Sequence, residues 1–228
     1  MYRTSLLALS AIVSMAPAAA LADTPRELLT TAAFQTATKP QALKLVAQAI
    51  TASDRILAAR PNDHEATLQR AIAIGYRGKL TRSRSDVRAS LDVFQKLAAA
   101  NPRDPEAQIV IAGWHLGAVD ELGGFLARTA LGARVSAGET ALAKAVALGG
   151  DRAFYPGLAA LLQIRNDPSD IAQARRWAEA AATGQAATPL DALMKRAALS
   201  VLPSLRANNG KAAAELARKL VPFGKIGD

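Results

Sequence analysis

Residues that typically begin an α-helix recur along the chain, and the segments between them carry apolar residues at helical spacing. Thr24-Pro25-Arg26-Glu27 combines an N-cap threonine, a first-turn proline and a glutamate three residues after the cap. Such a capping box satisfies the free backbone amides at the start of a helix. Further start signals are Asp104-Pro105, Asp167-Pro168, Thr188-Pro189, a second capping box from Ser136 to Glu139, and the candidate caps Asp63 and Ser85. Gly149 is expected to end one helix with a positive φ.

Apolar residues follow the helical period between these signals, as Leu43, Val46, Ile50 and Leu57 do. Alanine is abundant, aromatic residues make up only 4% of the chain, and no segment alternates with period two. This composition favours helices over strands, so we expect an all-α protein without a sheet. We expect about ten helices, with two of the following ranges as candidates to merge: 24–37, 40–60, 64–77, 85–100, 105–118, 120–133, 137–148, 152–165, 169–183, 189–207 and 210–221.

Residues 1–22 have the features of a secretory signal peptide. Arg3 gives a positive start, Leu6 to Met15 form a short apolar region, and Ala20-Leu21-Ala22 fits the small-residue cleavage pattern. We expect cleavage after Ala22 and a mature chain, residues 23–228, in the periplasm or secreted. The alternative interpretation of this segment is a buried first helix.

The mature chain is basic and lacks an obvious membrane span. The full sequence carries a net charge of +9, and removal of Arg3 with the signal leaves +8. An exported chain of this charge favours anionic partners, so an anionic envelope surface is a candidate partner, whereas export argues against nucleic acid. The apolar stretch from Ile109 to Leu126 is interrupted by Asp120 and Glu121, so no transmembrane segment is expected after the signal. The absence of cysteine excludes disulfides and thiolate chemistry.

Two stretches of the chain resemble each other at a spacing of 41 residues. Residues 57–66, LAARPNDHEA, align with residues 98–107, AAANPRDPEA, when Pro61 is placed on Pro102. In both copies a helix ends near the proline and the next helix begins a few residues later. A degenerate third copy covers residues 151–183.

This pattern resembles the tetratricopeptide repeat, in which pairs of antiparallel helices stack through small residues. The positions that carry the resemblance are the small residues Ala49, Ala71, Ser90 and Ala112, the aromatic Phe94, and Ser53, which departs from the aromatic pattern. The resemblance implies a single domain, residues 23–228, whose helix pairs stack as a right-handed superhelix or solenoid. It also implies an adaptor whose concave groove holds a peptide or a partner helix.

A basic segment contains the residues by which this spacing exceeds the usual repeat of about 34. It runs from Tyr76 to Arg84, and we expect it to be a surface loop. Its candidate binding residues are Tyr76 and Arg77, because arginine binds carboxylate and phosphate groups through two hydrogen bonds. Arg128 and Arg134 are expected to add charge to such an anion site. A solvated loop without a ligand is the alternative.

Residues 113–125, GWHLGAVDELGGF, contain four glycines within expected helices. Each glycine costs about 1 kcal/mol relative to alanine in a helix interior. Such glycines mark either tight helix packing or a break beside a pocket, and both interpretations stay open. The candidate binding residues of this segment are Trp114, His115, Asp120, Glu121 and Phe125.

The leading functional hypothesis is an exported scaffold that binds a protein or peptide, without catalytic residues, metal or cofactor. The alternative is a carrier of a small or lipidic ligand, which resembles the periplasmic helical components associated with solute transporters. A third hypothesis is a hydrolase that uses His115 with Asp120 or Glu121. A scaffold requires an open, polar-rimmed groove, and a carrier a closed apolar cavity of a few hundred Å³. A hydrolase requires His115 within hydrogen-bond reach of a carboxylate.

Overall fold

The computed structural model describes residues 23–226, so the expected signal peptide lies outside the described part. Eleven α-helices cover these residues, and their only β-type pairing is an isolated bridge between Arg152 and Gln185. The expected all-α class is confirmed, and none of the expected helices merges. The helices are α1 (Pro25–Phe34), α2 (Lys39–Ala59), α3 (His64–Thr81), α4 (Arg84–Ala100), α5 (Pro105–Leu122), α6 (Gly124–Leu131), α7 (Val135–Leu148), α8 (Phe154–Asn166), α9 (Ile171–Thr183), α10 (Pro189–Arg206) and α11 (Gly210–Leu220).

Four of the expected N-caps are confirmed. The hydroxyl of Thr24 accepts a hydrogen bond from the Glu27 amide, and the Glu27 carboxylate accepts one from the Thr24 amide at 2.8 Å. Thr188 forms a second capping box, with an aspartate as its acidic partner. Asp63 and Asp104 each accept a hydrogen bond from an amide in the first turn of α3 and α5. These helix starts follow from local side-chain chemistry.

Three expected helix starts are wrong. Ser85 is not a cap, because Ser83 accepts the hydrogen bond from the amide of Asp86. Asp167 instead accepts hydrogen bonds from the amide and hydroxyl of Ser169, which delays α9 until Ile171. The third, Ser136, already lies inside α7, because that helix begins at Val135 after Arg134.

Two further expectations about chain reversals are also wrong. Gly149 keeps a φ of −74°, and the following Gly150 adopts the positive φ of 64°. The basic segment from Tyr76 to Arg84 is not a loop, because α3 continues to Thr81. The last turns of α3 pack closely against α4 at Gly78, where an added Cβ would lie 2.9 Å from atoms of Val87.

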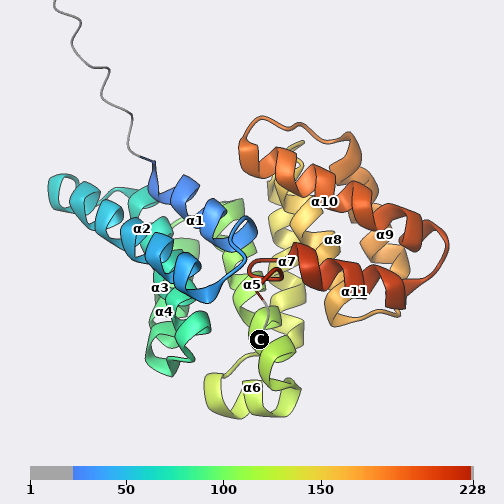
Figure 1. Ribbon diagram of the computed structural model, residues 1–228, viewed down its shortest axis with the longest axis horizontal. Coiled ribbons are helices and arrows are strands. Elements are labelled where there is room, and N and C mark those ends of the chain that lie inside the picture. The colour runs from blue at the N-terminus through green and yellow to red at the C-terminus, as the bar shows by residue number, and fades with distance from the viewer. Residues whose placement is uncertain (1–22, 227–228) are drawn as a thin grey trace, which may run out of the picture.

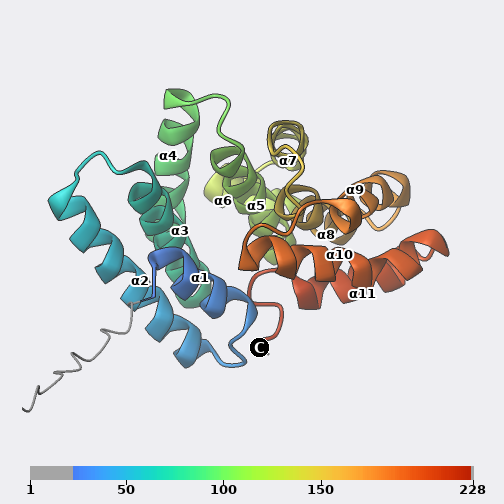
Figure 2. The ribbon, with the colours of Figure 1, turned by 90° about the horizontal axis from the view of Figure 1, so that it is seen from above.

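The helices pack as five successive antiparallel hairpins, which follow one another along an arc (Figures 1 and 2). The hairpins are α1–α2, α3–α4, α5–α7, α8–α9 and α10–α11. Pro61 and Pro102 lie in the turns between the first and second and between the second and third hairpins. The small residues Ala49, Ala71 and Ala112 are fully buried or nearly so, which lets neighbouring helix axes approach closely.

The segment after α11 ties the two ends of the arc together. The amide of Phe223 donates a hydrogen bond to the carbonyl of Ala33 at 2.7 Å. Its ring packs edge-on against Tyr76 of α3, with ring centroids 4.8 Å apart. A single core cluster consequently reaches from Phe34 in α1 to Phe223. This segment thereby connects the last hairpin to the first two.

No single helix within residues 23–226 is long and apolar enough to cross a membrane. Helices α5 and α6 together meet the length and composition, but they are bent by 119° at Gly123. The bend makes α6 project from the hairpin row at the lower edge of Figure 1.

Candidate functional site

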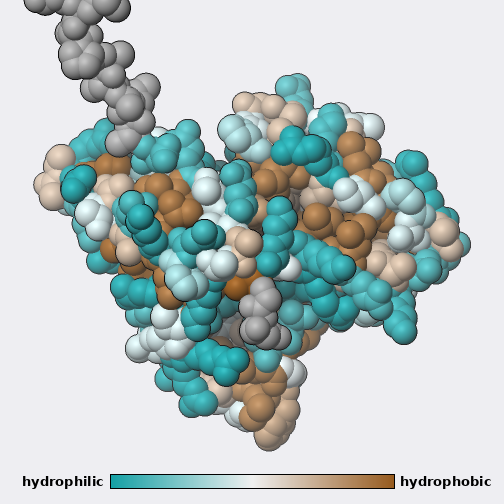
Figure 3. Space-filling model, viewed as in Figure 1, coloured by the Kyte–Doolittle hydropathy of each residue, from teal (hydrophilic) through white to brown (hydrophobic). Residues whose placement is uncertain are grey.

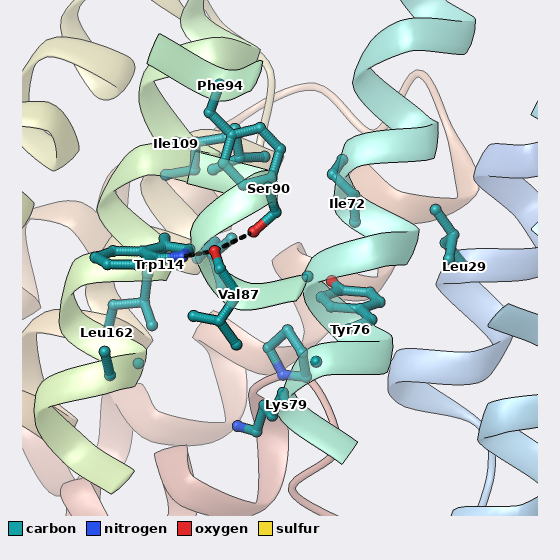
Figure 4. Close-up of a pocket in the computed structure, with 18 of the residues that line it drawn as sticks. Leu29, Ile72, Tyr76, Lys79, Val87, Ser90, Phe94, Ile109, Trp114 and Leu162 are labelled. Carbon is teal, nitrogen blue, oxygen red and sulfur yellow. Dashed lines mark hydrogen bonds between the residues drawn. The ribbon is translucent and has the colours of Figure 1, made fainter. Parts of the chain in front are cut away.

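A cavity of about 650 Å³ lies on the inner side of the arc. The first helix of every hairpin, α1, α3, α5, α8 and α10, contributes to its wall, together with α4. Most of the lining side chains are apolar, and Figure 4 shows Leu29, Ile72, Phe94, Trp114 and Leu162 around the space. Volumes of about 300–1,000 Å³ are typical of small-molecule sites. The size and lining therefore suit a largely apolar ligand.

Two glycines on one face of α5 form part of the cavity wall. Gly113 and Gly117 are one helical turn apart, and a Cβ added to either would meet no atom within 4 Å. A glycine required for tight packing behaves differently. A Cβ on Gly138 of α7, for example, would lie 2.7 Å from Leu116. The glycine-rich part of α5 thus borders open space rather than a close helix contact.

The indole of Trp114 forms a fixed part of the wall between α4 and α5. Its Nε1 donates a hydrogen bond of 2.7 Å to the carbonyl of Val87. The same carbonyl accepts a hydrogen bond from the hydroxyl of Ser90 at 2.8 Å (Figure 4). Because the polar atom of the indole is satisfied by α4, its ring presents apolar surface to the cavity.

A ladder of ion pairs crosses one end of the cavity at the start of the first helices. Arg26 of α1 forms a two-hydrogen-bond pair with Glu65 of α3 and another with Glu106 of α5. Arg152, just before α8, lies 3.6 Å from Glu106 and 3.3 Å from the fully buried Asp191 of α10. These charges hold the five hairpins in register, and they are largely neutralised by one another.

The other end of the cavity carries a cation whose hydrogen bonds are incomplete. Arg165 of α8 is only 5% exposed, and neither its Nε nor its Nη2 has a hydrogen-bond partner within the described residues. Its Nη1 lies 3.7 Å from Asp120. Burial lowers the pKa of Arg165, against the opposing effect of Asp120 and Glu121. Glu121 is itself paired with Lys79 at 2.9 Å.

The structure brings together only part of the candidate binding residues. Tyr76, Trp114 and Glu121 line the cavity. Arg77 turns to α4 and forms two hydrogen bonds with Asp86, which lower the pKa of that carboxyl group. The remaining candidates, Asp120, His115, Phe125 and Arg128, lie outside the cavity lining.

His115 lacks the partner that a hydrolase requires. It is 7% exposed, and its Nδ1 accepts a hydrogen bond of 3.3 Å from the amide of Arg134. Burial, with a smaller effect of Arg134, lowers the pKa of His115. No hydrogen bond joins it to a carboxylate within residues 23–226. In the same part of the chain, no three metal-ligating side chains come together.

Helix α6 and the end of α5 display exposed apolar side chains. Phe125 is 79% exposed, and Leu126 of the same helix is also exposed. Neither lines the cavity, whereas Leu122 at the end of α5 is exposed and also lines it. Figure 3 shows apolar side chains gathered where α6 projects. Arg128 lies on the same short helix and is exposed. The candidate binding residues expected within 113–125 therefore divide between the cavity wall and the projecting helix α6.

Sequence reasoning missed Arg165 and the aliphatic wall of the cavity. The available signal was a cation shortly after the apolar run 158–162 inside an expected helix. Leu29, Phe34 and Leu162 come from helices far apart in sequence, and their periodicity indicates only that they face inward.

The chain matches no protein-family model, no curated protein and no solved structure.

Proposed function

We propose that the mature protein is an exported, non-catalytic carrier of a small, largely apolar ligand. The observation that carries this proposal is the apolar cavity of about 650 Å³ on the inner side of the arc. The volume and the apolar lining of this cavity suit a carrier of a small ligand better than a peptide scaffold. The polar groups at one end are engaged in the ion-pair ladder, which leaves few free hydrogen-bonding groups for a peptide backbone.

The glycines of the cavity wall support the proposal. Gly113 and Gly117 each weaken α5 by about 1 kcal/mol relative to alanine, although a Cβ at either site would clash with nothing. A residue that destabilises a helix without improving its packing is expected where the open space beside it serves a function. The open volume beside α5 is, in this proposal, the space that the ligand fills.

We further propose that the hairpins form a tetratricopeptide-like array. Pro61 and Pro102 lie at equivalent turns, and the residues at the small positions, including Ser90, are buried. Ser53, which replaces the usual aromatic, is also fully buried, so the site has lost its large side chain. In such an array the first helices line the concave face, which is where the cavity lies.

A protein partner is the second candidate, and the exposed apolar tip of α6 favours it. Phe125 and Leu126 of α6 are large apolar side chains that are exposed. In the proposed carrier, this tip is the place where a protein or an anionic envelope surface would bind, since Arg128 adds positive charge.

Binding of a neutral apolar dye, N-phenyl-1-naphthylamine, tests the carrier proposal. We expect saturable fluorescence enhancement with residues 23–228, and its loss in a Gly113→Leu/Gly117→Leu variant whose side chains occupy the cavity. Ala47→Leu, on the exposed face of α2, is the control for an added leucine and should bind the dye normally. Phe125→Ser separates the cavity from the α6 tip, and it should also leave binding unchanged. Equal binding by the double glycine variant would refute the proposal.

A further inference from the structure

The guanidinium of Arg165 is the least satisfied buried charge in the described part of the chain. Its Nε and Nη2 are shielded from water and have no hydrogen-bond partner among residues 23–226. Its Nη1 is 3.7 Å from Asp120, too far for a hydrogen bond. A buried charge without hydrogen bonds is unfavourable, because it has lost its water and gained nothing in return. The residue lines the cavity, so a rotation of its side chain would bring this edge to a group inside the cavity.

The unused edge of this guanidinium matches a carboxylate. Nε and Nη2 point to the same side of the group, and together they donate two parallel hydrogen bonds. The protein uses this same edge elsewhere. Arg26 binds Glu65 through Nε and Nη2 at 2.8 and 2.6 Å, and Arg77 binds Asp86 through the same two atoms at 2.7 and 2.9 Å. Among the arginines within residues 23–226, Arg165 has both atoms of this edge buried and without a hydrogen-bond partner.

The charged groups around Arg165 carry a net positive charge. Asp120 and Glu121 are the acidic groups that act on it, and Glu121 is already paired with Lys79. Lys79, Arg165 and the more distant Arg218 together exceed these two acids by one positive charge. Arg82 and Arg84 add further positive charge to the cavity lining at the same end. This end of the cavity is therefore net positive and favours an anionic ligand.

We infer that the ligand is an amphipathic carboxylate, whose apolar body fills the cavity and whose carboxylate is bound by the Nε–Nη2 edge of Arg165. This inference rests on the proposed carrier function and specifies its ligand class. In this inference, ligand binding includes a rotation of the Arg165 side chain that brings the shielded edge into the cavity. The apolar body lies along Leu158 and Leu162 of α8, and Trp114 of α5 covers its other side.

The test compares dodecanoate with dodecan-1-ol as competitors for the bound dye, N-phenyl-1-naphthylamine, at neutral pH. The two molecules share an apolar chain and differ in charge. Charge-assisted hydrogen bonds are strong enough for an affinity difference of about ten- to a hundredfold. We expect dodecanoate to bind the wild type at least about tenfold more tightly than the alcohol.

Arg165→Met removes the charge and keeps an unbranched apolar stem without creating an unpaired polar atom. In this variant the preference for dodecanoate should fall to about onefold, while the affinity for dodecan-1-ol stays unchanged. Lys96→Met, which removes an exposed cation of α4 outside the cavity lining, is the control and should keep the preference.

The outcomes distinguish the two proposals. Absence of dye binding by the wild type overturns the carrier function itself. Equal affinities of dodecanoate and dodecan-1-ol overturn the carboxylate inference and leave the carrier function standing. A preference for dodecanoate that survives in Arg165→Met overturns the assignment of Arg165 as the binding group.

Discussion

Replacement of the two glycines in the cavity wall by alanine should stabilise the protein. Gly113 and Gly117 are interior residues of α5, and an alanine Cβ at either site meets no atom within 4 Å. The only expected effect is the gain in helix propensity, about 1 kcal/mol for each substitution. For a chain of this size, 1 kcal/mol corresponds to a rise in Tm of roughly 2–4 °C. The double variant should therefore melt about 4–8 °C above the wild type, if the two effects add.

Gly138→Ala is the matched control, because this glycine also lies inside a helix but has no free space. Its Cβ would lie 2.7 and 2.8 Å from carbons of Leu116 and 3.2 Å from the Cβ of His115. Overpacking of this kind costs about 1–3 kcal/mol, which outweighs the gain in helix propensity. Thermal melts followed by circular dichroism at the helix band measure all the variants. A lower Tm for Gly113→Ala or Gly117→Ala would refute the open cavity wall.

Three further predictions concern the ladder, the histidine and the two aromatic environments. Glu106→Gln removes the charge that two arginines share, so urea denaturation should show a loss of about 1–3 kcal/mol, and an unchanged midpoint would contradict the ladder. The lowered pKa of His115 means that the unfolded chain, whose histidine titrates near 6.5, binds the proton more readily than the folded protein. The free energy of unfolding should therefore fall as the pH drops below about 6.5, and His115→Asn should reduce this slope between pH 7 and 5.5; an identical slope would show that His115 is not the group responsible. Phe94→Ala should cost about 3 kcal/mol because the ring is 4% exposed, whereas Phe125→Ala, at 79% exposure, should stay within about 0.5 kcal/mol; similar losses for both would contradict the burial of the two rings.

Local chemistry was sufficient to place most of the helices. The caps at Thr24, Asp63, Asp104 and Thr188 act within one turn of backbone, so they have the same effect in the isolated sequence as in the fold. The wrong starts at Ser85 and Asp167 were each decided by a serine two residues away, and the third involves a distant residue. Ser136 is a sound cap by local criteria, but α7 begins one residue earlier, where the amide of Arg134 is bound by His115, 19 residues away.

Only the tertiary structure decided where the cavity lies. Gly113, Gly117 and Gly138 are equivalent by sequence, since each interrupts an expected helix at the same local cost. They differ in what a Cβ would meet, which is set by side chains of other helices: nothing for the first two, and Leu116 for the third. The same holds for Arg165, whose type was visible in the sequence although its missing partners were not.

The sequence of this protein thus determined its all-α class and the positions of most helix ends, because those depend on hydrogen bonds and side-chain periodicity over a few residues. The tertiary structure decided which inward faces meet and which stand apart, because close packing is a relation between segments distant along the chain. The cavity, its glycine wall and the unpaired edge of Arg165 all arise from that relation.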